Sequence, residues 1–246
     1  MANNVLFWDF HGTLTQPDSL WSRSLHRAAL AAFPDCGLEL DTVRTCLDNE
    51  GFPWHRPERD YRHLSDPECW WLYVNQLFIT TCRRCGFDQE QSEQIVPLIR
   101  PQLTDPAYFH LIDNAELVLA DLQQAGWRHF MLSNNFPELP ELCRLLGIDV
   151  YFDQIIVSAQ AGFEKPHPEI FKIALAAIEK PDLCFMVGDN PVADIAGAQA
   201  AGIPGILVNR PYYENGQPGE PAYRCQNLLE LRELCLNLVD RQSVTI

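Results

Sequence analysis

The sequence predicts an α/β fold, with a Rossmann-like, doubly wound parallel sheet as the core and an α-helical cap domain inserted after the first strand. Three observations predict it. Short apolar runs, typical of strands buried on both faces, recur along the chain. Amphipathic stretches of helical period separate the later runs. A long segment without a comparable strand pattern separates the first run from the second.

The core elements are expected to alternate along the chain. The β-rich apolar runs are 5–8, 129–132, 154–157, 183–187 and 205–208. The amphipathic stretches between and after them are 114–125, 137–146, 168–178, 192–201 and 227–239. Alternation of strand and helix favours a parallel sheet with helices on both faces. Residues 212–221 contain several Gly and Pro residues and are expected to form a surface loop.

The segment from Gln16 to Pro106 is expected to be helical. Apolar residues repeat at helical spacing in 19–33, 41–47, 66–85 and 88–99. Asp66-Pro67 and Asp88 are suitable helix starts. We therefore predict a core of residues 1–15 and 107–246 and a helical cap of residues 16–106. Trp70 and Trp71 are expected to anchor the cap's own core; the alternative is that one of the two rings lines a substrate pocket.

The composition narrows the function classes. The 246 residues include 33 Asp and Glu against 18 Lys and Arg, a formal charge of -15 that disfavours nucleic acid as a partner. No apolar run is long enough to span a bilayer, and the first residues lack a signal-peptide pattern. The nine cysteines follow no regular spacing, which fits reduced thiols. We expect a soluble, cytoplasmic protein without a membrane partner; the oligomeric state is left open.

Polar groups follow the first two predicted strands. In open α/β sheets, ligands bind at the carboxyl ends of the strands, so these positions are informative. The first strand ends in Asp9-Phe10-His11-Gly12-Thr13, which places a carboxylate at the strand tip and a glycine where backbone can approach an anion. The second ends in Ser133-Asn134, which offers a hydroxyl and backbone N–H groups to a phosphate or, alternatively, a helix cap.

Two later strand ends carry complementary charge. Lys165 precedes a proline-initiated helix after the third strand, and only two other lysines occur in the chain, Lys172 and Lys180. An ammonium at this junction could neutralise a phosphate. Asp189 and Asp194 flank the turn after the fourth strand. Carboxylates are the ligands that Mg²⁺ prefers, although either aspartate could instead cap a helix.

These segments resemble the four signature motifs of the haloacid dehalogenase superfamily: Asp9 to Thr13, Ser133, Lys165, and Gly188-Asp189 with Asp194. The resemblance covers the core closely and the cap only by position and helical character. It implies a magnesium-dependent phosphatase acting on a small phosphorylated metabolite, in which Asp9 attacks phosphorus to form an aspartyl-phosphate that water hydrolyses.

The resemblance also assigns the remaining residues. Mg²⁺ would be held by the Asp9 carboxylate, the backbone carbonyl of His11 and Asp189, with Asp194 close by. Ser133 and the N–H of Asn134 would hold the phosphoryl oxygens, in a site that includes Gly12 and Thr13. Lys165 and the metal would offset the charge on the transferred group.

His11 departs from the family pattern, because related phosphatases usually place a second aspartate there as general acid and base. Histidine can do the same work, since its unperturbed pKa of about 6.5 lets it give and take protons near neutrality. We expect His11 to act in this way. The alternative is that His11 packs or hydrogen-bonds and leaves proton transfer to solvent.

Other activities of the superfamily fit less well. Dehalogenases lack the magnesium-binding acid pair that Asp189 and Asp194 provide, and phosphonoacetaldehyde hydrolases need a cap lysine, which residues 16–106 do not contain. Phosphomutases depend on the acid that His11 replaces. The alternative from a different class is a non-catalytic or weakly active protein that binds a phosphate ligand, with His11 marking lost chemistry.

Overall fold

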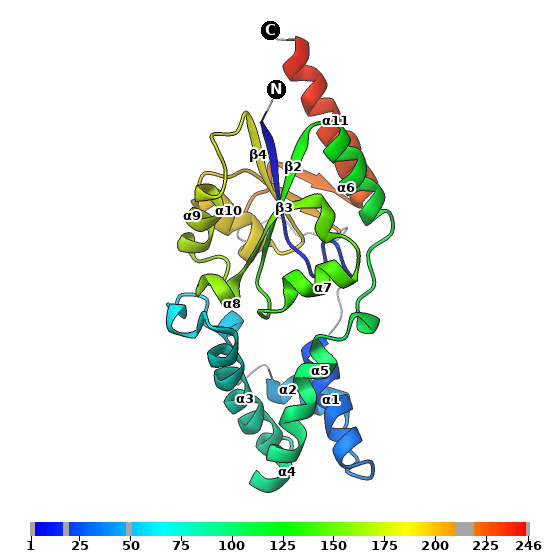
Figure 1. The fold of residues 1–246 in the computed structure, drawn as a ribbon, viewed down its shortest axis with the longest axis vertical. Helices are drawn as coiled ribbons and strands as arrows, with labels where there is room; N and C mark the ends of the chain where they lie inside the picture. The colour runs from blue at the N-terminus through cyan, green and yellow to red at the C-terminus, as the bar shows by residue number, and fades with distance from the viewer. Residues whose placement is uncertain (1–2, 17–19, 48–50, 210–218, 245–246) are drawn as a thin grey trace.

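The computed structural model describes residues 3–16, 20–47, 51–209 and 219–244. Its centre is a six-stranded, fully parallel sheet in the order β3-β2-β1-β4-β5-β6 (Figure 1). The strands are β1 (Asn4–Trp8), β2 (Trp127–Ser133), β3 (Phe152–Val157), β4 (Leu183–Gly188), β5 (Gly205–Val208) and β6 (Tyr223–Cys225). The predicted parallel sheet is confirmed. β1 lies between β2 and β4. The sheet grows from β1 through β2 to β3 on one side and through β4 and β5 to β6 on the other.

Helices cover both faces of the sheet, as the sequence predicts for a doubly wound fold. The core helices are α6 (Ala115–Gln124), α7 (Leu139–Leu145), α8 (Ser158–Ala161), α9 (Pro168–Ala176), the π-helix η6 (Pro191–Ala196), α10 (Gly197–Ala200) and α11 (Leu228–Val244), with a 3₁₀ turn η5 (Asp149–Tyr151).

Alternate residues of β1 face the two layers, because successive side chains of a strand point to opposite faces. Leu6 and Trp8 pack in one apolar cluster with residues of α6, α7 and α11. Val5 and Phe7 pack in a second cluster with residues of α9 and α10. Burial on both faces explains why the central strands read as continuous apolar runs in the sequence.

The described part of residues 20–108 contains helices as its only regular elements. They are α1 (Leu20–Ala32), α2 (Leu40–Leu47), α3 (Pro67–Arg84), α4 (Gln89–Ile95) and α5 (Ile99–Leu103), with 3₁₀ turns η1 (Pro53–His55), η2 (Arg62–Leu64), η3 (Val96–Leu98) and η4 (Pro106–Tyr108). This helical segment lies at the end of the molecule opposite the two termini (Figure 1). Its boundaries as a cap, residues 16 and 106, stay a prediction.

The helix starts predicted at Asp66-Pro67 and Asp88 are confirmed. Oδ1 of Asp66 accepts hydrogen bonds from the N–H groups of Glu68 and Cys69, at 3.0 and 3.1 Å, and Pro67 occupies the first helical turn, where it has no N–H to leave unbonded. Asp88 forms a reciprocal capping box with Gln91. The two caps fix where α3 and α4 begin.

Three elements differ from the expectation. β6 was not predicted, because it has only three residues and two of them are exposed. The stretch 192–201 is a π-helix followed by α10 rather than one α-helix. The stretch 88–99 ends its α-helix at Ile95 and continues as a 3₁₀ turn that contains Pro97. Most of the loop expected at 212–221 lies outside the described residues; 219–221 have no regular structure.

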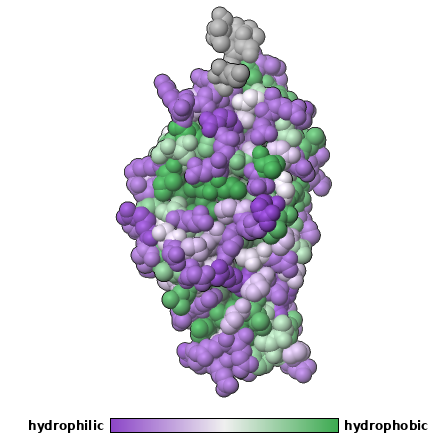
Figure 2. Space-filling model, in the orientation of Figure 1, coloured by the Kyte–Doolittle hydropathy of each residue, from purple (hydrophilic) through white to green (hydrophobic). Residues whose placement is uncertain are grey.

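Hydrophilic residues cover much of the face drawn in Figure 2, interrupted by apolar groups over the sheet and over the helical segment. None of the helices that the structure describes combines the length and the apolar composition needed to cross a membrane.

Candidate active site

The carboxyl ends of the strands surround a cavity of about 440 Å³, at the edge of the sheet that faces the helical segment. The residues that line it are Asp9, His11, Gly12, Trp54, Asn134, Lys165, Asp189, Asn190, Ala193 and Asp194. Seven of the nine residues that the sequence singles out are therefore brought together. Thr13 and Ser133 are the two that do not line it; both are buried, with exposures of 0% and 1%.

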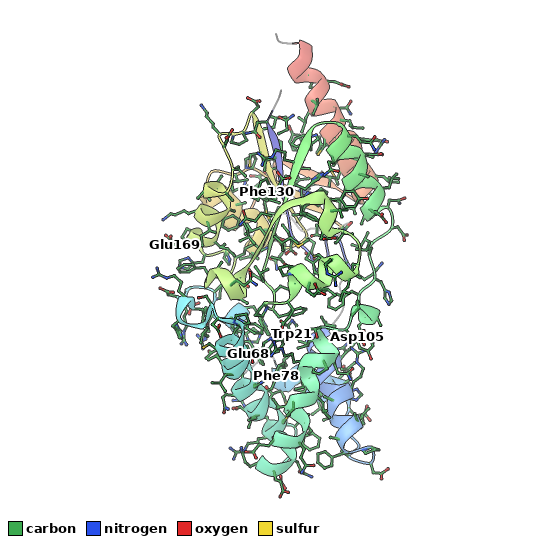
Figure 3. All side chains as sticks on the ribbon, in the orientation of Figure 1. Trp21, Glu68, Phe78, Asp105, Phe130 and Glu169 are labelled. Carbon is green, nitrogen blue, oxygen red and sulfur yellow. The ribbon has the colours of Figure 1, made fainter. Side chains whose placement is uncertain are left out.

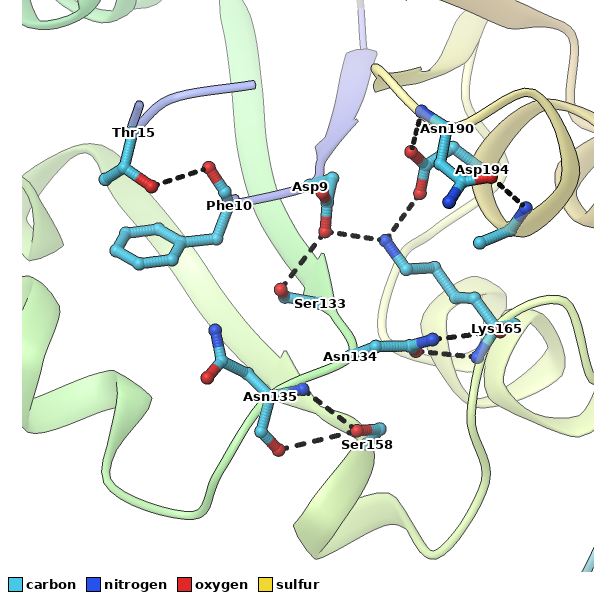
Figure 4. Close-up of polar contacts among 11 residues, drawn as sticks. Asp9, Phe10, Thr15, Ser133, Asn134, Asn135, Ser158, Lys165, Asn190 and Asp194 are labelled. Carbon is cyan, nitrogen blue, oxygen red and sulfur yellow. Dashed lines mark hydrogen bonds and ion pairs between the residues drawn. The ribbon is translucent and has the colours of Figure 1, made fainter. Parts of the chain in front are cut away.

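Lys165 is the central cation of the site. Its Nζ lies 2.8 Å from Asp9 Oδ1 and 2.6 Å from Asp194 Oδ1, and the residue is 3% exposed (Figure 4). Burial by itself lowers the pKa of this lysine, but Asp194 and Asp9 outweigh it and raise the pKa, so the ammonium stays charged. The lysine thus holds together two carboxylates that come from different strands.

Asp194 has both oxygens engaged. Besides the contact of Oδ1 with Lys165, Oδ2 accepts a hydrogen bond from the backbone N–H of Asn190 at 2.9 Å. Burial raises the pKa of Asp194 to about 6, and the neighbouring Asp9 adds to the rise while Lys165 opposes it. With the ammonium at 2.6 Å, we take the pair as charged. The Asn190 side chain caps η6 by accepting from the N–H groups of Val192 and Ala193, which fixes this turn.

Ser133 and Asn134 support the charged groups from the end of β2. The Ser133 hydroxyl donates to Asp9 Oδ1 at 3.1 Å (Figure 4). The Asn134 side chain clamps the backbone of Lys165: Nδ2 donates to the Lys165 carbonyl at 2.9 Å, and Oδ1 accepts from the Lys165 N–H at 2.7 Å. Both hydrogen bonds of the Asp9 carboxylate end on Oδ1, and Oδ2 accepts none from the described residues, which leaves that oxygen for the cavity.

The loop after β1 is shaped by close approach of backbone to carboxylate. Gly12 has φ +77°, and a Cβ at this position would lie 2.6 Å from the Asp189 carboxyl group, so only glycine fits without strain. The Asn209 side chain, just beyond β5, donates to the carbonyls of Gly12 and Thr13 at 2.9 and 3.2 Å. Asn209 was not singled out from the sequence, although its position directly after a buried strand could have indicated a role at this edge of the sheet.

His11 lines the cavity beside Asp9. Its ring stacks against Phe109, with centroids 5.7 Å apart, and meets Phe10 edge-on. Its Nδ1 lies 3.4 Å from the hydroxyl oxygen of Thr15, which itself donates to the carbonyl of Phe10. A second cavity of about 190 Å³ begins on the other side of His11 and also contacts Arg23 and His110.

Asp9, Asp189 and Asp194 form the one cluster of potential metal ligands found among the described residues. Each offers a carboxylate oxygen, and these oxygens lie within 4.8 Å of one another. Carboxylates at this spacing are the donor set that Mg²⁺ prefers. The site therefore fits the implied cofactor, with Asp194 as its least available oxygen donor because Lys165 and Asn190 already occupy it.

Three lining residues were not singled out from the sequence. Asn190 and Ala193 lie between Asp189 and Asp194, and the third is Trp54. It lies in η1, far from the motifs in the chain, and no local pattern indicates that it reaches the cavity. The tryptophans singled out instead, Trp70 and Trp71, are buried in the apolar core of the helical segment, as expected. Trp71 also reaches the sheet part, because its Nε1 donates to Glu138 at 2.8 Å.

Comparison with known proteins shows which family the chain matches. The family model of haloacid dehalogenase-like hydrolases matches residues 4–202. A phosphoserine phosphatase of Thermus thermophilus is 32% identical over half of this chain and half of its own length. A glyceraldehyde 3-phosphate phosphatase of Methanopyrus kandleri is 28% identical over 89% of this chain and 88% of its own. The chain thus spans only about half of the first of these relatives.

A solved structure agrees with the fold. The hydrolase YfnB of Bacillus subtilis, described as bound to magnesium, superposes with a TM-score of 0.71 and 22% identity over 96% of this chain and 99% of that chain. At this identity the likeness concerns the fold alone. Because the family model covers most of the sequence, the resemblance inferred from the motifs is confirmed: the chain belongs to the haloacid dehalogenase-like hydrolases.

Proposed function

We propose that the protein is a magnesium-dependent phosphatase that hydrolyses a small phosphate monoester through a phosphorylated Asp9. The observation that carries the proposal is how the two oxygens of the Asp9 carboxylate are hydrogen-bonded. Ser133 and Lys165 fix Oδ1, at 3.1 and 2.8 Å, while Oδ2 is left for the cavity at the sheet edge. A held carboxylate with one available oxygen can act as a nucleophile on phosphorus.

Mg²⁺ would be held by the Asp9 carboxylate, the His11 carbonyl and Asp189, with Asp194 nearby, and would supply charge neutralisation for the phosphoryl oxygens. The mutual spacing of the three carboxylates supports this assignment. Lys165 would contribute positive charge on the same side. The backbone N–H of Asn134 and the loop of Gly12 and Thr13 would orient the phosphoryl group.

In the first step, Asp9 Oδ2 forms a bond to phosphorus as the ester P–O bond breaks, and the leaving oxygen takes a proton from His11. In the second step, neutral His11 takes a proton from water as the water oxygen bonds to phosphorus and the P–O bond to Asp9 breaks, which releases phosphate and restores the Asp9 carboxylate. The Thr15 hydroxyl supports one tautomer: because it donates to the Phe10 carbonyl, it can only accept from Nδ1–H, and Nε2 then carries the lone pair.

The helical segment of residues 16–106 would serve as the cap that closes over the substrate and excludes water. The phosphatases among the relatives, named for phosphoserine and glyceraldehyde 3-phosphate, support a small phosphorylated metabolite as substrate. All nine cysteines are free, which supports a reducing compartment such as the cytoplasm.

The test is a panel of phosphorylated metabolites with Mg²⁺, run on the wild type and on Asp9→Asn. We expect wild-type turnover that stops with a chelator, and a loss on the order of 10³-fold or more in Asp9→Asn. Asp41→Asn makes the same chemical change at an exposed surface pair with Arg44 and serves as the control. Binding of phosphate esters without turnover by the wild type would instead support the non-catalytic alternative.

A further inference from the structure

Trp54 occupies a special place in the cavity. It is the one described lining residue that comes from the helical segment; the others lie at or near the ends of β1, β2 and β4 or on the loop of Lys165. Those other residues surround the position proposed for the phosphoryl group. Trp54 is therefore the side chain that can meet the rest of the substrate.

Aromatic packing holds the Trp54 ring in place. It stacks on Phe52, with centroids 4.6 Å apart and an interplanar angle of 15°, and it packs on Trp21 at 4.5 Å. Trp21 in turn packs against Phe78 of α3 and Phe136 of the sheet part. Figure 3 labels Trp21 and Phe78 on the side of the helical segment that faces the core. A ring fixed in this way contacts a ligand at little entropic cost.

The loop that carries Trp54 is also fixed relative to Lys165. The N–H of Tyr61 donates to the carbonyl of Gly162 at 2.8 Å. Gly162 has φ +77°, and a Cβ there would lie 2.5 Å from the Cα of Arg62, so the backbone of η2 rests directly on the loop that leads to Lys165. The segment that follows Trp54 is thereby held against the loop of Lys165 by backbone contact.

The charges of the cavity restrict what can lie beside Trp54. The described lining residues include three carboxylates and one lysine, Lys165. The ammonium group of Lys165 already contacts Asp9 and Asp194. A carboxylate or second phosphate on the leaving group would lose water against an indole ring without gaining a further counter-charge from the described lining residues. An uncharged, apolar face would instead gain contact area.

We propose that Trp54 is a specificity-determining residue that selects phosphate monoesters whose leaving group is uncharged and presents an apolar face to the indole. This inference rests on the phosphatase function proposed above and names its substrate class. The competing assignment is Arg23, which lines the smaller cavity beyond His11 and would suit an anionic leaving group.

The experiment compares benzyl phosphate with 4-carboxybenzyl phosphate, two esters that differ by a charge at the far end of the leaving group. The wild type should favour benzyl phosphate by about tenfold or more in kcat/KM, and Trp54→Ala should reduce this preference by about tenfold, the scale of one lost apolar contact. Trp54→Phe keeps an aromatic face and should retain most of it. Leu72→Ala, at an α3 residue that is 65% exposed, is the control for changes in the helical segment and should behave as the wild type.

Two results would overturn the inference. One is an equal loss of kcat/KM on both esters in Trp54→Ala, or no change on either. The other is a wild-type preference for the carboxylated ester that Arg23→Ala abolishes. If the wild type cleaves neither these esters nor any other, the proposed function fails. The role of Trp54 is then decided by calorimetric titration of benzyl phosphate into Asp9→Asn and into the double variant Asp9→Asn/Trp54→Ala. Weaker binding to the double variant supports the inference, and unchanged binding overturns it.

Discussion

Glu164 is a buried acid whose replacement by glutamine should stabilise the protein at alkaline pH. The residue is 4% exposed, next to Lys165 in the chain, and its Oε2 has no hydrogen-bond partner among the described residues. Burial raises the pKa of Glu164 from an ordinary 4.5 to about 7, against the opposing effects of Ser158 and Lys165. Glutamine has nearly the same shape and cannot ionise.

The size of this stabilisation and its pH window follow from the difference between the pKa of Glu164 in the folded state and its ordinary value. Between pH 4.5 and about 7 the folded state keeps the Glu164 proton and the unfolded state has lost it, so the free energy of unfolding falls as pH rises. A difference of about 2.5 pKa units corresponds to about 3 kcal/mol. Glu164→Gln should therefore match the wild type below pH 4.5 and exceed its stability by up to about 3 kcal/mol above pH 7.

The assay is urea unfolding of both proteins between pH 5 and 8.5. Glu90→Gln, at an exposed position of α4, makes the same chemical change and should give a pH-independent difference near zero. A gain for Glu164→Gln that is the same at every pH, or a loss of stability at pH 8, would show that Glu164 is not a protonated buried acid. Glu164 does not line the cavity, so phosphatase activity should be retained.

Three further predictions concern other contacts. Burial lowers the pKa of His129 from 6.5 to about 4, so its protonation in the unfolded state should cost the wild type about 2 kcal/mol of stability between pH 6.5 and pH 5. His129→Gln lacks this contribution and keeps Glu164, so the difference in the free energy of unfolding between the two proteins, measured by urea unfolding, should change by about 2 kcal/mol between pH 7.5 and pH 5. Asn209→Ala removes two hydrogen bonds to the loop after β1, each worth about 1 kcal/mol. It should lower kcat/KM by about tenfold or more, while circular dichroism shows that the protein stays folded. Glu138→Gln weakens the bridge from Glu138 to Arg100 and Trp71, so amide hydrogen exchange in α3 and α5 should quicken; Glu141→Gln, which disturbs a surface pair within α7, should leave it unchanged.

The sequence predicted the strands well where burial made them distinctive. β1 and its neighbours β2 and β4 are buried over most of their length, so their apolar runs stood out, and the polar residue after each run was correctly assigned to one edge of the sheet. β6 could not be recognised, since it has only three residues and two of them are exposed, so it forms no apolar run. The π-helix was missed because its apolar pattern is close to that of an α-helix.

Contacts between distant segments were the least predictable part of the site. Nothing near Trp54 in the chain indicates that η2 rests on Gly162 or that Trp21 links Trp54 to Phe136, and both contacts hold η1 near the cavity. In the same way, the motif places Asp194 near the metal site but does not reveal that its two oxygens are already bonded to Lys165 and Asn190. Residue type predicted the chemistry available, and the partners of each residue had to come from the structure.

The charge of the site gives a reason for a cation that is independent of the motif resemblance. Asp9, Asp189 and Asp194 bring three carboxylates together, and Lys165 contacts two of them, Asp9 and Asp194. A phosphate monoester dianion would approach these carboxylates in a protein whose formal charge is -15. A divalent cation held by the carboxylates would add two positive charges beside them and reduce the repulsion that opposes the approach of the ester to Asp9. Activity should accordingly require the metal even for substrates with a good leaving group, for which the proton of His11 is dispensable.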